Sequence, residues 1–185
     1  QIRKFHGKYY LYYISNSFDP NYKLNKEAEK TWQHWLRYNC TQKIGVLVAD
    51  NVEDFKNGKY HHVEQTLMQP DNVKTFEITN NPSVCEGPNG KYNMIFKSRV
   101  LYFGHMTHWI AMSDKPDGPF KIINDVFTSA DMSCEDPSLW YDKRRKRFYA
   151  VVKYLSNSQK LVPQLGALAL ITSQDGLKWK PATHT

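Results

Sequence analysis

Cysteine is scarce in this sequence, and the few present form no recognised metal or redox pattern. The 185 residues include only Cys40, Cys85 and Cys134, which are widely separated and odd in number. No Cys-x-x-Cys spacing occurs, so the sequence offers no basis for a zinc site or a redox-active pair.

Long hydrophobic runs are also lacking. No stretch approaches the roughly 18 apolar residues that a membrane-spanning helix needs, so we expect no membrane contact. The chain does not begin with Met and carries no signal-peptide pattern, because Gln1 starts almost directly in a strand pattern. We therefore expect an upstream portion that was cleaved or is missing, and a secreted or periplasmic protein.

Charge of one sign is in excess, without a motif that would explain it. The formal net charge is +7, which could attract a polyanion. The basic residues are scattered, however, and we find no nucleic-acid recognition motif, so no nucleic acid is expected. The densest basic run, residues 143–147, reads as the solvated tip of a hairpin. If the basicity matters, an anionic polysaccharide is the partner it favours.

Aromatic residues are abundant, at 14% of the chain, which favours β-structure. The strongest signal is a repeat, in which a turn precedes an aromatic strand at 7–14, 90–97 and 146–153. Each copy is followed by an apolar strand and a polar turn, at 45–56, 109–121 and 168–180. Four antiparallel strands repeated in this way predict the blades of a β-propeller. A β-sandwich is the rival fold, but it would not repeat one internal order three times.

The repeat divides the chain into three expected blades, at about 1–70, 78–127 and 133–182. The first contains an insertion, residues 16–43, where the spacing of Trp32, Trp35 and Leu36 predicts a short helix. This helix would either pack on the flank of the propeller or border a cleft.

Four segments in this order resemble the five-bladed β-propeller glycoside hydrolases of family 43 and relatives such as the neoagarooligosaccharide hydrolases. They read "NPSVCEGPNGKYNMIFKSR", "THWIAMSDKPDGPFKII", "EDPSLWYDKRRKRFYAVV" and "TSQDGLKWKPA". The resemblance spans nearly the whole chain except the insertion. It implies an all-β, five-bladed propeller of which this chain is apparently a fragment with about three blades.

The resemblance also implies catalytic carboxylates at the starts of the innermost strands. Glu135 would be the general acid, with a pKa raised by a partly dry cavity. Asp136 would orient it or bind a sugar hydroxyl, although an Asp before Pro is also ordinary turn chemistry. In the second blade, where the family has an Asp that tunes the acid, this sequence has Asn81 beside Asn80. The general base would lie upstream of Gln1.

Further substrate-binding candidates are weaker. Lys97 and Lys153 end equivalent aromatic strands, where each could reach a hydroxyl or a carboxylate, or remain a snorkelling surface lysine. His105 and His108 lie on a linker expected to border the cavity. No third ligand accompanies them, so we expect no metal and no cofactor in this chain. The sequence does not decide whether a structural cation binds in another part of the protein.

The sequence thus predicts a glycosidase that cleaves a plant or algal polysaccharide or oligosaccharide with inversion. A phosphorylase of similar fold, a non-catalytic sugar-binding propeller and a protein-interaction propeller are the alternatives. Asn81 in place of Asp, and the base expected outside the chain, are the features that favour a binding-only protein.

Overall fold

The computed structural model of the protein describes residues 1–16, 42–101, 106–125, 134–154 and 166–182. The expected helix within 16–43 and His105 lie outside the described residues.

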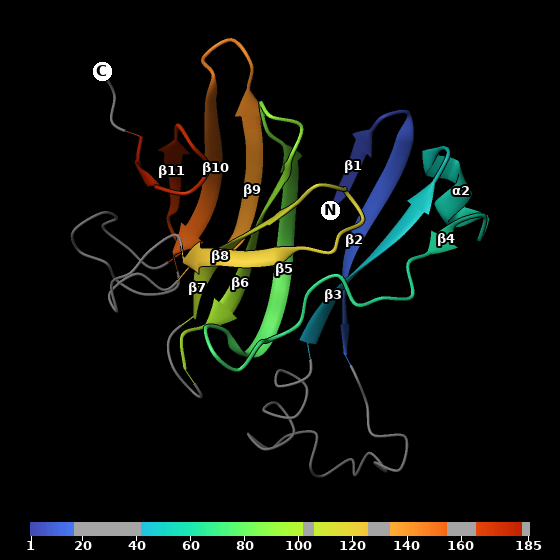
Figure 1. Ribbon diagram of the computed structural model, residues 1–185, viewed down its shortest axis with the longest axis horizontal. Coiled ribbons are helices and arrows are strands. Elements are labelled where there is room, and N and C mark those ends of the chain that lie inside the picture. Colours follow the sequence, from blue (N-terminus) through green and yellow to red (C-terminus); the bar gives the residue numbers. More distant parts are fainter. Residues whose placement is uncertain (17–41, 102–105, 126–133, 155–165, 183–185) are drawn as a thin grey trace.

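The described residues form three antiparallel sheets of four strands each (Figure 1). Within each sheet, strands adjacent in sequence are paired. The first sheet consists of β1 (Ile2–Phe5), β2 (Lys8–Asn16), β3 (Gln42–Ala49) and β4 (His61–His62). The second consists of β5 (Phe76–Glu86), β6 (Tyr92–Arg99), β7 (Met106–Ser113) and β8 (Lys121–Asp125). The third consists of β9 (Cys134–Asp142), β10 (Arg147–Tyr154), β11 (Leu168–Ser173) and β12 (Lys180–Pro181). The prediction of an all-β fold with a repeated order of strands is confirmed.

One local expectation is wrong. The repeat predicts that the apolar strand of the first unit ends in a polar turn within 45–56. Instead β3 is followed by a short helix, α2 (Val52–Lys56). Asn51 caps it, because its side chain accepts from the Asp54 amide and the Asp54 carboxylate accepts from the Asn51 amide. This reciprocal capping box stabilises a helical turn in the polar segment, and the short last strand of the unit follows as β4.

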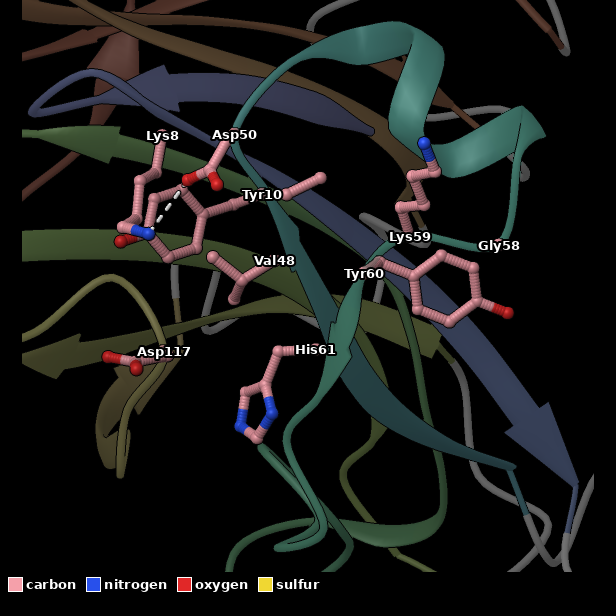
Figure 2. A pocket seen from close by; sticks show the side chains of 10 residues that line it. Lys8, Tyr10, Val48, Asp50, Gly58, Lys59, Tyr60, His61 and Asp117 are labelled. Atoms are coloured by element: carbon pink, nitrogen blue, oxygen red, sulfur yellow. Dashed lines mark hydrogen bonds and ion pairs between the residues drawn. The ribbon is translucent and has the colours of Figure 1, made fainter.

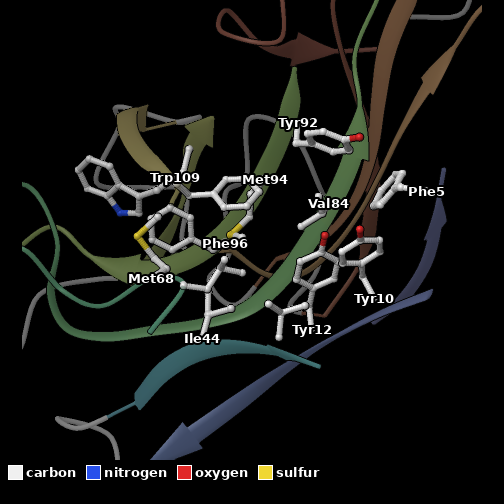
Figure 3. Packing of buried hydrophobic residues seen from close by; sticks show 14 residues of the cluster. Phe5, Tyr10, Tyr12, Ile44, Met68, Val84, Tyr92, Met94, Phe96 and Trp109 are labelled. Carbon is white, nitrogen blue, oxygen red and sulfur yellow. The ribbon is translucent and has the colours of Figure 1, made fainter. Parts of the chain in front are cut away.

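The middle sheet is covered on both faces, which defines two separate cores. Side chains of a strand alternate between its faces. On β6, Met94 and Phe96 therefore join the core shared with the first sheet (Figure 3), whereas Ile95 joins the core shared with the third. Every residue of β6 is buried. The three sheets consequently stack face to face in sequence order, unlike the two layers of a β-sandwich.

The sheets also meet along the strands β1, β5 and β9, each the first strand of its sheet. Gln1 donates through Nε2 to the Ser83 hydroxyl at 2.8 Å and accepts from the Val84 amide at 2.7 Å. The same hydroxyl accepts from the Leu139 amide at 2.8 Å, and Arg3 donates to the Leu139 carbonyl at 2.5 Å. These bonds tie all three sheets together at one edge.

Candidate functional site

Two equivalent bulges shape the inner edge of the second and third sheets. They occur at residues 80–83 in β5 and 135–138 in β9, where an Asn-Pro-Ser and an Asp-Pro-Ser interrupt the strands. The pairing register shifts at both places. Asn81 and Asp136 have φ values of 49° and 54°, a left-handed conformation that Asn and Asp tolerate better than most residues. A bulge of this kind re-aims a side chain out of the ladder.

The re-aimed side chains line a hollow between the sheets. Its volume is about 370 Å³, and its lining residues come from all three sheets: Gln1, Tyr12, Tyr13, Ile14, Asn81, Pro82, Asp136 and Pro137. The Asn81 amide donates to Oδ1 of Asp136. The Asp136 side chain is 55% exposed, so its carboxylate remains accessible from the hollow. Among the described residues of this lining, Asp136 is the acidic one.

Glu135 has a different environment from its neighbour. Its side chain is only 18% exposed and lies between two ammonium groups, with Oε2 2.8 Å from Lys97 Nζ and Oε1 2.7 Å from Lys153 Nζ. Burial alone would raise the pKa of the Glu135 carboxyl, but the hydrogen bonds and charges of Lys153 and Lys97 outweigh it and lower the pKa below its ordinary value. The predicted rise of this pKa is therefore wrong.

Both lysines contact the Glu135 carboxylate, which is one of the two alternatives that the sequence left open for them. They occupy equivalent positions, because Lys97 is opposite Asn80 and Lys153 is opposite Glu135 in the strand registers. Lys97 is not a surface lysine, since its side chain is 9% exposed. Lys153 is more open and also lies 3.6 Å from Oδ2 of Asp136. The hydrogen bond from Lys153 Nζ to Glu135 Oε1 raises the pKa of Lys153.

Two other predicted residues do not reach the hollow. His108 is not on a linker but within β7, and it is 0% exposed. Neither ring nitrogen has a hydrogen-bond partner among the residues described. Burial and the charge of Lys97 lower the pKa of His108 to about 3. Asn80 is also buried, and its amide donates to the Gln42 side chain. The prediction that His108 contacts the substrate is therefore wrong, because its ring is fully buried within β7.

Sequence reasoning missed Gln1 and Ser83, which hold the edge of the hollow together. The signal was present in the repeated Asn-Pro-Ser and Asp-Pro-Ser triplets, whose serines have equivalent positions. Only the fold shows that the first serine is buried between sheets whereas Ser138 is exposed.

In the part of the chain that the structure describes, no group of three His, Cys, Asp or Glu side chains could hold a metal ion. None of the described helices is long and apolar enough to cross a membrane.

Comparisons with known proteins bear on the fold. No protein-family model and no curated protein sequence matches the chain. Solved structures do match. A β-xylosidase superposes with a TM-score of 0.67 at 18% identity, over 98% of this chain and 57% of its own. The fold is that of a β-propeller.

Two more of these propeller structures show the range of proteins that share the fold. A β-1,2-mannobiose phosphorylase of Listeria innocua has a TM-score of 0.65 at 13% identity, covering 97% of this chain and 56% of that one. A family 117 glycoside hydrolase of Zobellia galactanivorans has a TM-score of 0.60 at 18% identity, covering 98% and 44%. This chain thus spans about half the length of the propeller structures that it matches.

Proposed function

We propose that this chain contributes part of a carbohydrate-binding cavity in a secreted or periplasmic propeller that cleaves a glycosidic bond in an oligosaccharide or polysaccharide. The observation that carries the proposal is Asp136, a half-exposed carboxylate aimed by a bulge into a hollow formed by three converging sheets. The similar propeller structures of a β-xylosidase and of a family 117 glycoside hydrolase support it.

In this proposal Asp136 is the residue that faces the sugar. Its Oδ1 accepts from Asn81 and its Oδ2 lies 3.6 Å from Lys153 Nζ, yet the side chain is 55% exposed, so the carboxylate can still accept from sugar hydroxyls. Glycosidic cleavage passes through a transition state with positive charge on the sugar ring, which a nearby carboxylate stabilises. Asn81 fixes the orientation of this carboxylate and offers its remaining amide positions to the sugar.

Glu135 then has a supporting role instead of the proton-donating one that the family resemblance implies. A general acid must hold its proton at the working pH, and two ammonium groups at 2.7 and 2.8 Å favour the ionised form of Glu135. The proton donor for an inverting reaction would come from another part of the cavity wall. A second carboxyl group about 6.5–9.5 Å from the first is the arrangement that inversion requires.

Asp136→Asn tests the proposal in the whole protein. On a panel of aryl glycosides and linear oligosaccharides, we expect kcat/KM to fall by about 100-fold or more, with the thermal midpoint little changed. Glu135→Gln is the informative comparison. It removes the charge that compensates two lysines, so it should lower the thermal midpoint and reduce activity in step with the folded fraction. Activity of Asp136→Asn within a few-fold of the wild type would contradict the proposal.

A phosphorylase is the second candidate, because a phosphorylase structure matches at a TM-score of 0.65. The lysines next to the hollow do not favour it, since Glu135 and Asp136 together already balance the charge of Lys97 and Lys153. Turnover that requires inorganic phosphate and releases a sugar phosphate would establish this alternative. Oligosaccharide binding without any turnover would establish a non-catalytic binding protein.

A further inference from the structure

A second hollow lies at the opposite end of β2 from the first. Tyr12, Tyr13 and Ile14 line the hollow at Asp136, whereas Lys8 and Tyr10 line this one (Figure 2). Its volume is about 630 Å³, which lies in the range of small-molecule sites. The described residues of its lining come from the first sheet, from the connections on either side of α2, and from Asp117 in the connection between β7 and β8.

The floor of this hollow follows from the strand registers of the first sheet. Tyr10 is opposite Val48, and Val48 is opposite His61, so the three side chains form one row across β2, β3 and β4. Two residues along the chain, Tyr12 and Val46 form an equivalent row that is buried in the core. In the outer row Tyr10 is still buried, Val48 is half-buried and His61 is exposed, so burial decreases from β2 toward β4.

The wall opposite the row carries a half-buried carboxylate. Asp117 belongs to the connection between β7 and β8, and it makes no side-chain hydrogen bond or ion pair with the residues that the structure describes. At the rim, Lys8 and Asp50 already neutralise one another at 2.8 Å. Figure 2 shows Asp117 on the connection from the second sheet and His61 on β4, with Val48 and Tyr10 above them.

These groups select among ligand classes by their chemistry. Because Lys8 and Asp50 cancel each other's charge, the Asp117 carboxylate is left to repel phosphate and other anions, while the Lys59 ammonium repels cations. A purely apolar ligand would leave the Asp117 carboxylate without a partner at a dry interface. A sugar ring suits all of them, since its hydroxyls both donate and accept, and its C–H face can pack on Tyr10 and Val48. The Asp117 carboxylate would accept from hydroxyls, and the His61 ring would bond a neighbouring one.

We propose that this hollow is a second carbohydrate-binding site, which holds a neutral oligosaccharide on the outer edge of the first sheet through Asp117 and His61. The inference rests on the proposed function for the class of ligand, but not for the residues. Because the hollow is open and its floor is narrow, binding is weak and serves to retain a polymeric substrate near the cavity at Asp136.

The test follows ring signals of His61 and side-chain amide signals of Asn81 by NMR in the whole protein, titrated with linear xylo-, manno- and agaro-oligosaccharides. His61→Gln and Asn81→Asp assign the two signals. We expect both signals to shift, and the His61 shift to persist in Asp136→Asn. Asp117→Asn should weaken the response at His61 about tenfold or more, the loss expected for a hydrogen bond to a charged group.

Asp114→Asn is the matched control. Asp114 lies on the same connection as Asp117 but pairs with Lys91 at 3.1 Å, outside the hollow, so this change should leave the His61 response within about twofold. A response at Asn81 without one at His61 would overturn the second site and leave the proposed function standing. A response at neither signal would overturn both. Equal weakening by Asp114→Asn and Asp117→Asn would also overturn the second site, because it would indicate a general charge effect.

Discussion

The two adjacent carboxylates at the inner edge of the third sheet, Glu135 and Asp136, have very different surroundings. Glu135 is enclosed by two lysines, whereas Asp136 is turned into the hollow and bonded by an amide. Removing one partner of a buried ion pair leaves an uncompensated charge, which is far more costly than the net value of the pair. The Glu135 cluster therefore fixes the inner edge of the third sheet, and Asp136 is the carboxylate that faces the hollow.

His108 offers a prediction at the same scale. Its folded-state pKa of about 3 lies below the roughly 6.5 of an unfolded histidine, so below pH 6.5 the unfolded chain binds a proton that the folded chain does not. Stability is therefore lost as the pH falls. From pH 7 to pH 5 this residue should cost about 2 kcal/mol. His108→Leu should abolish this pH-dependent cost in urea unfolding, because leucine binds no proton in either state. No hydrogen bond is lost with the ring.

A His108→Leu protein that loses as much stability at pH 5 as the wild type would show that the ring is protonated in the folded state, with Glu135 as its counter-charge.

Among the elements, the bulges of β5 and β9 decide where the site lies. A left-handed backbone costs an ordinary L-residue about 1–2 kcal/mol, and a glycine almost nothing. Alanine is normally the more stable of the two in a strand. At Asn81 this order should reverse, so Asn81→Gly should exceed Asn81→Ala in stability by about 1 kcal/mol in thermal or urea unfolding.

Ser138 supplies the comparison for this reversal. It is exposed on β9, two residues beyond Asp136, and is not among the residues with positive φ. Ser138→Ala should therefore be more stable than Ser138→Gly. The same order at both positions would mean that the backbone at Asn81 is not held in the left-handed region.

The order and type of the strands could be predicted from the sequence, because the repeat reports a local alternation that each strand obeys on its own. The helix α2 was not predicted, because the polar residues after β3 match the polar turn of the other repeats, and a capping box such as Asn51 with Asp54 is also compatible with a turn. Asn-Pro and Asp-Pro were recognised as sites of unusual backbone, but a turn and a bulge look alike in sequence. The burial of His108 and the pairing of Glu135 with Lys97 depend on the packing of separate sheets, which no local pattern encodes.

For the molecule as a whole, Ser83 connects all three sheets through one hydroxyl. Ser83→Ala removes the acceptor of the Leu139 amide and of the Gln1 side chain in a fully buried position. We expect a loss of about 1–3 kcal/mol in the free energy of unfolding. Hydrogen exchange of the Leu139 amide should accelerate, which reports the loosened contact between the second and third sheets.

Ser113→Ala is the reference for this prediction. Ser113 is also buried, but its hydroxyl accepts from the Lys115 amide within a local turn. It should cost less than Ser83→Ala and leave exchange at Leu139 unchanged. Equal effects of the two substitutions would show that Ser83 contributes locally and does not couple the sheets.

The alternation along β6 has an experimental consequence of its own. Met94 and Ile95 are consecutive in the chain, yet they belong to different cores on opposite faces of the middle sheet. A spectroscopic probe moved by a single position would thus change which neighbouring blade it monitors. Probes placed at these two consecutive positions would report separately on the loss of packing at each face of the middle sheet during unfolding.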